Sequence, residues 1–131
     1  MPDPRKLAVA ALCALPLAAA ACGGSSGGSD TASGPGEKQY RQYACAGCHS
    51  LDGRDGTGPT FKGLAGSMVT LEDGKKVKAD AAYLEKAITD PDTDVTKGYN
   101  AGIMKAGIDG FDLQNRPEDV AKLVEFIESV K

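Results

Sequence analysis

The chain has 131 residues, which is enough for one domain and short for two. Its formal net charge is −3, whereas a nucleic-acid-binding protein needs a dominant basic surface. We therefore expect one acidic domain that does not bind nucleic acid.

The first 21 residues are predicted to be an export signal and not part of the fold. Arg5 and Lys6 precede the wholly apolar run LAVAALCALPLAAAA at residues 7–21. A helix that spans a bilayer needs about 20 apolar residues, and Pro16 interrupts this shorter run. A basic start, an apolar centre and small residues at the end are typical of a signal peptide, so we expect an exported protein.

Cys22 follows the apolar run directly. The stretch LAAAACGGSS resembles a bacterial lipoprotein signal, in which the cysteine becomes the lipid-modified first residue. Acyl chains on Cys22 would anchor the protein to the outer face of the cell membrane. Ordinary cleavage after Ala21 would instead leave a periplasmic protein. Residues 22–35 are rich in Gly and Ser and predict a flexible linker, with an r.m.s. span of about 20 Å.

Residues 36–131 are predicted to form the folded domain. Tyr40, Tyr43 and Ala44 fall on one helical face, which predicts a short amphipathic helix running into the motif CAGCH. Residues 52–66 are rich in glycine and are expected to form a loop.

A hairpin and a helix are predicted next. The dipeptide Asp-Gly at residues 73–74 is flanked by β-branched residues within the segment 68–79, which is a strong hairpin signal. Residues 80–89 predict a helix with Asp80 as the N-cap, ended by the Asp-Pro pair at residues 90–91. The apolar face of this helix is expected to contain Tyr83, Leu84, Ala87 and Ile88.

The C-terminal part of the chain contains one long loop and one clear helix. Residues 90–112 show no sustained periodicity and are predicted to be an irregular loop. Residues 116–131 predict a helix with Pro117 at its first position. Its buried stripe is expected to comprise Val120, Leu123, Val124 and Ile127. Loops of this length in a compact domain usually have a reason, and a large ligand that they wrap is one.

The motif CAGCH contains Cys45, Cys48 and His49, the only histidine of the chain. A redox dithiol, half of a zinc site and a haem attachment site are the competing interpretations. A thioredoxin-like dithiol lies at a helix N-terminus in a βαβ unit, and a zinc site needs four ligands; the sequence indicates neither. Two thiols at this spacing can add to the two vinyl groups of one haem edge, with the adjacent histidine on the iron. The motif therefore predicts one covalent haem c.

The iron of such a haem needs a sixth ligand or an open site. His49 has no second histidine to join it, which leaves the methionines of the domain. Met68 is close to His49 in the sequence, whereas Met104 lies in the second long loop, with enough chain to pass round to the opposite haem face. We expect His49 and Met104 to ligate the iron. A thioether ligand favours reduced iron, so the reduction potential should be relatively high.

With these features the domain resembles a class I c-type cytochrome. Gly36 and Tyr40 match the glycine and aromatic residue of that family's N-terminal helix, which packs on the C-terminal helix. Pro59, in GTGPTFKGLAG, matches the proline whose carbonyl accepts a hydrogen bond from the ligating histidine. The resemblance implies a mainly α class I cytochrome c fold, with three to four short helices around one covalently bound haem and a small β-hairpin insertion.

A narrower resemblance is carried by four segments, YACAGCHSLDG, GPTFKGLAGSMVTLEDG, AAYLEKAITDPDTDVTKGY and DVAKLVEFI. They are similar to the cytochrome c domain of subunit II in caa3-type haem–copper oxidases, over nearly all of residues 36–131. We expect a stand-alone, lipoprotein-like form of that domain, because no copper-binding domain or paired transmembrane helices precede it. The chain departs from the family after Met104, where Lys105 and Ala106 stand where a proline is usual.

These features predict an electron carrier and not an enzyme. A six-coordinate haem leaves no site for a small-molecule substrate, so we expect single electrons to pass between respiratory partners such as a haem–copper oxidase and a bc-type complex. A lipid on Cys22 would keep the domain concentrated near them. The alternative is a haem enzyme or gas sensor, peroxidase-like, in which Met104 is displaceable.

Overall fold

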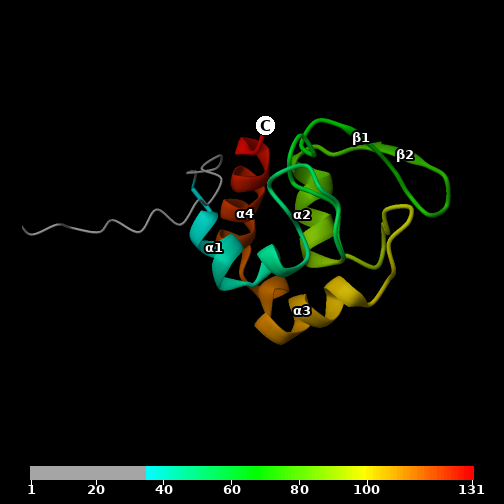
Figure 1. The fold of residues 1–131 in the computed structure, drawn as a ribbon. Helices are drawn as coiled ribbons and strands as arrows, with labels where there is room; N and C mark the ends of the chain where they lie inside the picture. Colours follow the sequence, from blue (N-terminus) through cyan, green and yellow to red (C-terminus); the bar gives the residue numbers. More distant parts are fainter. Residues whose placement is uncertain (1–34) are drawn as a thin grey trace, which may run out of the picture.

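The structure is a computed structural model that describes residues 35–131. The predicted export signal at residues 1–21 lies outside the described residues. So does the predicted linker at residues 22–35, except for its last residue. The described chain is mainly helical (Figure 1). Its elements are, in order, α1 (Glu37–Gln42), a 3₁₀ turn (Cys45–Gly47), β1 (Met68–Thr70), β2 (Lys76–Lys78), α2 (Ala81–Thr89), α3 (Ile103–Phe111), a second 3₁₀ turn (Leu113–Asn115) and α4 (Pro117–Ser129).

The first and last helices, α1 and α4, pack directly on each other (Figure 1). A Cβ atom on Gly36 would lie 1.9 Å from the backbone oxygen of Lys122, so only glycine allows the two backbones to approach this closely. Four residues later, the ring of Tyr40 packs 5.1 Å from that of Phe126, measured between centroids. The expected packing of the Gly36 and Tyr40 pair on the C-terminal helix is confirmed.

Helix α4 forms much of the core. It begins at Pro117, as predicted, and the four residues of the predicted stripe are all buried. Phe126 was not part of that prediction, yet it has no exposed surface. It follows Leu123 by three positions and therefore widens the apolar face toward α1. Burying a phenylalanine side chain contributes roughly 1.5–3 kcal/mol, so Phe126 is a main anchor of this pair of helices.

The hairpin and the second helix follow their sequence signals. Val69 in β1 pairs with Val77 in β2 in antiparallel register, and Gly74 in the turn has a φ of +84°, which glycine adopts readily. Asp80 caps α2 by accepting a hydrogen bond from the backbone N–H of Tyr83 at 3.0 Å. Leu84 faces the core from this helix, which ends just before the predicted Asp-Pro pair.

The predicted irregular loop at residues 90–112 is wrong in its second half, because α3 occupies Ile103–Phe111. Gly107 and Gly110 lie inside this helix and weaken the sequence signal, since glycine is a poor helix former. The helix has an apolar stripe, but it faces a cavity, and only Ile108 is buried against the rest of the chain.

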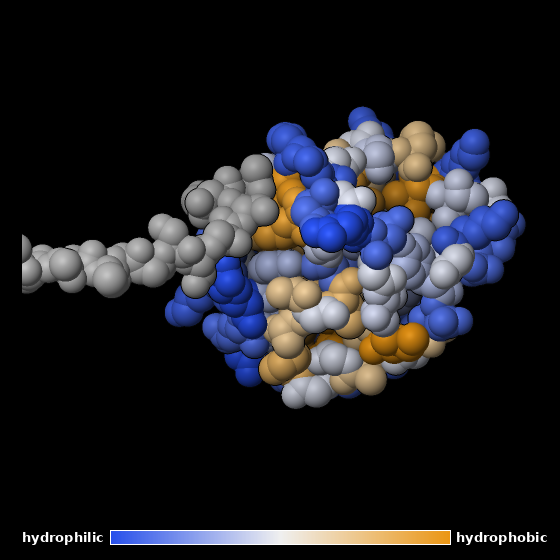
Figure 2. Space-filling view, in the orientation of Figure 1, coloured by the Kyte–Doolittle hydropathy of each residue, from blue (hydrophilic) through white to orange (hydrophobic). Residues whose placement is uncertain are grey.

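Apolar and polar residues are unevenly distributed over the surface. Figure 2 shows hydrophobic colours over α3, where Ile103 and Phe111 are 48% and 40% exposed, and a mixture of hydrophobic and hydrophilic colours over the hairpin. Within residues 35–131, no helix has both the length and the apolar character needed to cross a membrane.

Candidate functional site

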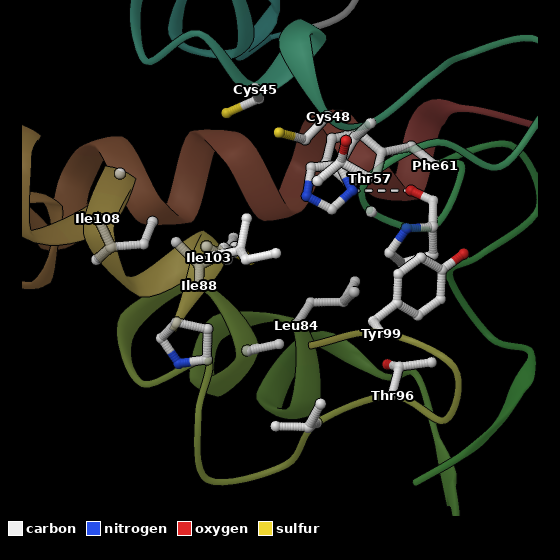
Figure 3. A pocket seen from close by; sticks show the side chains of 18 of the residues that line it. Cys45, Cys48, Thr57, Phe61, Leu84, Ile88, Thr96, Tyr99, Ile103 and Ile108 are labelled. Carbon is white, nitrogen blue, oxygen red and sulfur yellow. Dashed lines mark hydrogen bonds between the residues drawn. The ribbon is translucent and has the colours of Figure 1, made fainter. Parts of the chain in front are cut away.

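A cavity of about 210 Å³ lies between the cysteine motif and helices α2 and α3. It is lined mainly by apolar side chains, and Figure 3 shows several of them converging on it from different elements. The residues labelled there that come from the two helices are Leu84, Ile88, Ile103 and Ile108. All five predicted site residues, Cys45, Cys48, His49, Pro59 and Met104, line this one cavity.

A tight turn brings the two thiols together. The predicted helix ends before Ala44, which is exposed and has a left-handed φ of +53°, so its expected place on the helical face is wrong. The backbone then forms a 3₁₀ turn. In it the carbonyl oxygen of Cys45 accepts from the N–H of Cys48 at 3.1 Å and from the N–H of His49 at 2.9 Å. Figure 3 shows the Cys45 and Cys48 sulfur atoms directed to the same side, at the rim of the cavity.

The thiols are not arranged for dithiol or zinc chemistry. Cys45 and Cys48 are both free cysteines. Before a cofactor is attached, burial raises the pKa of the Cys45 thiol to about 11, in contrast to the low pKa of the nucleophile in a redox dithiol. No cluster of three or more metal-binding side chains of the His, Cys, Asp or Glu type occurs within the described residues.

His49 is buried in a fixed orientation. Its Nδ1 atom lies 2.8 Å from the carbonyl oxygen of Pro59, a contact marked by the dashed line in Figure 3. A carbonyl can only accept, so Nδ1 carries the proton and Nε2 keeps its lone pair for a metal. Burial lowers the pKa of His49, an effect that the hydrogen bond to Pro59 partly opposes. The neutral imidazole that a metal requires is therefore favoured.

Three neighbours hold the histidine in place. The ring of Phe61 stacks on the imidazole with centroids 4.6 Å apart and planes at 20°. A Cβ atom on Gly58 would lie 2.5 Å from Cε1 of His49, so this glycine is needed for the close approach of its backbone. The Tyr40 hydroxyl donates to the carbonyl oxygen of His49 at 2.6 Å, which ties the motif to the packed helices.

The methionine predicted as a ligand lies on α3, near its start. Met104 is half-buried, lines the cavity and packs against the hydrophobic core. Met68, the other methionine of the described residues, is 61% exposed on β1 and does not line the cavity. Of these two, only Met104 is available to a group bound in the cavity.

The residues present fit a covalently attached haem. The cavity wall supplies two thiols at one rim, a buried imidazole with a free Nε2, a thioether sulfur and a largely apolar lining. This donor set matches nitrogen and sulfur ligation of haem iron, and the apolar lining matches a porphyrin ring.

A mainly α domain with such a site defines the class of c-type cytochromes. A sequence model of the family described as Cytochrome c matches residues 33–131. The chain therefore belongs to the cytochrome c family: it has the class I cytochrome c fold, and one covalently bound haem c is its cofactor. Members of this family carry electrons to and from redox protein partners, and their domains are typically exported. A comparison with curated protein sequences gives no match.

Several residues of the site were not found by sequence reasoning. Phe61 and Gly58 lie in the glycine-rich loop, where no periodicity indicates which side chains face inward. Ile103 and Ile108 belong to the helix that the sequence did not predict. Met104, Ile108 and Phe111 have the helical spacing i, i+4 and i+7, but this signal is short, and the glycines Gly107 and Gly110 weaken it.

Proposed function

We propose that this chain is a monohaem electron carrier whose haem is attached through Cys45 and Cys48 and ligated by His49 and Met104. The observation that supports it best is the shared cavity lined by both thiols, the neutral imidazole and the thioether. The haem supplies one-electron oxidation and reduction at its iron. With His49 and Met104 both binding the iron, no coordination site would remain for a substrate.

The chain's residues have separate tasks in this proposal. Cys45 and Cys48 bind the cofactor edge through thioether bonds. Pro59 accepts the hydrogen bond from Nδ1 of His49, fixing the ring and strengthening Nε2 as a donor. Met104 would hold the iron through its thioether sulfur. The apolar lining excludes water, which favours the lower charge of reduced iron and hence a relatively high potential.

Ligation by Met104 is tested with a pair of methionine variants of the mature, haem-loaded protein. We expect wild type to show the methionine-to-iron charge-transfer band when oxidised and to bind carbon monoxide slowly when reduced. Met104→Ala should lose the band and bind carbon monoxide rapidly. Met68→Ala is the matched control, because Met68 is exposed and lies outside the cavity, and it should behave as wild type.

A wild-type protein that lacks the band and binds carbon monoxide at once would favour a haem enzyme or gas sensor. Loss of covalent haem in Cys45→Ser and Cys48→Ser, detected as a mass difference, tests the attachment separately from the ligation.

We further propose that the carrier is exported and tethered. Residues 1–21 are the proposed export signal, Cys22 the lipid attachment site, and residues 22–35 the linker that joins lipid and cytochrome c domain. Residues 36–131 would then form a domain held near the outer face of the membrane. Cys22→Ser should release the protein into the soluble fraction; a variant that stays in the membrane fraction would rule out lipidation as its anchor.

The proposed partners are respiratory complexes, a haem–copper oxidase on one side and a bc-type complex on the other. The similarity to the cytochrome c domain of caa3-type oxidase subunit II supports an oxidase as the electron acceptor. Oxidation of the reduced carrier by purified oxidases, compared with co-purification of the intact chain, would distinguish a mobile carrier from a fixed subunit. Failure of every tested oxidase to accept its electrons would overturn this assignment.

A further inference from the structure

The chain just before Met104 has little apolar burial to hold it. Among residues 97–103, only Tyr99 is half-buried, and the other residues are exposed. Tyr99 and Thr96 both line the cavity, as Figure 3 shows. This approach segment, defined as residues 95–103, therefore needs other contacts to fix its path past the cavity and into α3.

The β-hairpin provides the first set of these contacts. Thr96 forms an isolated antiparallel bridge with Leu71, the residue that follows β1. The N–H of Lys97 donates to the carbonyl oxygen of Thr70 at 2.9 Å, and the N–H of Glu72 donates to that of Val95 at 2.9 Å. The hairpin is thereby joined by its backbone to the wall of the cavity.

Two carboxylates supply the second set. Oε1 of Glu72 accepts from the backbone N–H of Gly98 at 2.7 Å, and Oδ1 of Asp92 accepts from that of Gly102 at 2.7 Å. Both glycines have left-handed φ values, +88° and +83°. Hydrogen bonds to a charged acceptor are stronger than neutral ones, so each carboxylate can fix a bend that the backbone alone would not maintain.

The position of Gly102 determines where Met104 lies. Gly102 is the N-cap of α3, and no side chain of its own caps this helix. The Asp92 carboxylate bonded to Gly102 places negative charge at the positive end of the helix dipole. The two carboxylates thus hold the approach segment at a point before Tyr99 and at the start of the helix that carries Met104.

We propose that Glu72 and Asp92 are positioning residues that hold the approach segment and thereby keep Met104 in place as an axial ligand. The second part rests on the proposed ligation by Met104. Glu72 carries the sharper test, because it lies on the hairpin and does not line the cavity.

The test compares Glu72→Ala with Glu72→Gln in the haem-loaded protein. Glutamine keeps an acceptor oxygen, whereas alanine removes it. Amide hydrogen exchange in the approach segment should be roughly tenfold faster in the alanine variant, the low end of the change expected for loss of one hydrogen bond to a charged group. The glutamine variant should recover most of the wild-type rate. Glu85→Ala, which removes an exposed carboxylate on α2 that bonds to no other described residue, controls for net charge.

Carbon monoxide binding is the second readout. The reduced Glu72→Ala protein should bind it several-fold faster than wild type, and Asp92→Ala should act in the same direction, with Asp92→Asn closer to wild type. Unchanged exchange in Glu72→Ala would overturn the proposal, as would faster exchange without faster carbon monoxide binding.

Failure of the ligation itself is recognised separately. Wild type would then lack the charge-transfer band and bind carbon monoxide rapidly before any substitution, while the exchange comparison still decides whether the carboxylates hold the segment.

Discussion

The two sides of the cavity are held in different ways. The histidine side, comprising residues 36–61 and α4, has buried aromatic rings and direct contacts between its helices. The methionine side, residues 90–111, buries little of its own surface, and Ile108 is the one buried residue of α3. The histidine side therefore has a core supplied by the chain, whereas the methionine side is shaped to pack against a group that the chain does not supply.

The largest expected effect is on haem-free protein. In a Cys45→Ser, Cys48→Ser double variant prepared without haem, amide protection in α3 should fall by roughly a hundredfold or more, because its apolar stripe then faces an empty cavity. Protection in α4, measured by hydrogen exchange in the same sample, serves as the control and should fall much less. Equal protection of both helices would contradict the difference between the two sides.

Gly36→Ala should destabilise the histidine side by preventing the close approach of α1 and α4. The new Cβ would collide with the backbone oxygen of Lys122, and the φ of +95° is unfavourable for alanine. We expect a loss of about 3 kcal/mol in the free energy of unfolding, measured by chemical denaturation. Gly63→Ala has a left-handed φ of +67° but no atom within 4 Å, so it isolates the backbone contribution. Equal losses in both variants would show that the close approach contributes nothing.

Gly58→Ala should displace the histidine and leave the helix pair intact. Its Cβ would overlap the imidazole of His49, and we expect a loss of about 2 kcal/mol together with a changed haem spectrum. Gly47 lies in the motif that contains His49, with nothing within 4 Å of an added Cβ, so Gly47→Ala should keep the wild-type spectrum. An unchanged spectrum in Gly58→Ala would indicate that His49 has more room than its contacts imply.

Asp119→Asn should weaken the histidine side in a pH-dependent manner. Oδ2 of Asp119 accepts a hydrogen bond from the Tyr43 hydroxyl at 2.5 Å, and Oδ1 accepts one from the side-chain amide of Gln39 at 3.2 Å. Both bonds lower the pKa of Asp119, and the bond from Tyr43 has the larger effect. A carboxyl with a lowered folded pKa stabilises the protein above its unfolded pKa of about 4, and this contribution is lost as pH falls through the folded pKa. The stability difference between wild type and Asp119→Asn should therefore be present at pH 7 and shrink below about pH 4.

Unfolding free energies at several pH values check this expectation. Glu125→Gln, on the exposed face of the same helix, controls for the loss of one negative charge. If the difference in unfolding free energy between wild type and Asp119→Asn stays constant down to pH 3, protonation of Asp119 does not contribute to the acid sensitivity of the fold.

The smallest expected effect is a gain on the methionine side. Gly110 is exposed within α3, and an added Cβ would meet nothing within 4 Å. Gly110→Ala should therefore stabilise this helix by about 0.5–1 kcal/mol, measured as increased amide protection in haem-free protein. Reduced protection would mean that α3 requires its glycines for packing.

Sequence reasoning succeeded where local chemistry decides the structure. The Asp-Gly turn, the Asp80 cap and Pro117 each act within a few residues, and the hairpin, α2 and α4 follow from them. The motif at Cys45–His49 likewise predicts the cofactor, because its spacing matches the chemistry of attachment.

Sequence reasoning failed where the apolar face of an element packs against the ligand site. The inward stripe of α3 is broken by Gly107, so its periodicity is weak, and Ile103 stays half exposed. The contact of Gly58 with His49 depends on how a loop folds back over the motif, and the stacked Phe61 depends on the same path. Neither contact has a periodic pattern in the sequence that would reveal it.

The pairing of α1 with α4 also determines when the domain can close. Its side-chain hydrogen bonds join residues 80 and 76 positions apart, Gln39 and Tyr43 with Asp119. Nearly the whole domain must therefore be synthesised before the helix preceding Cys45 has its partner. The half-buried place of the two cysteines at the cavity rim is therefore completed only after the last helix has been made.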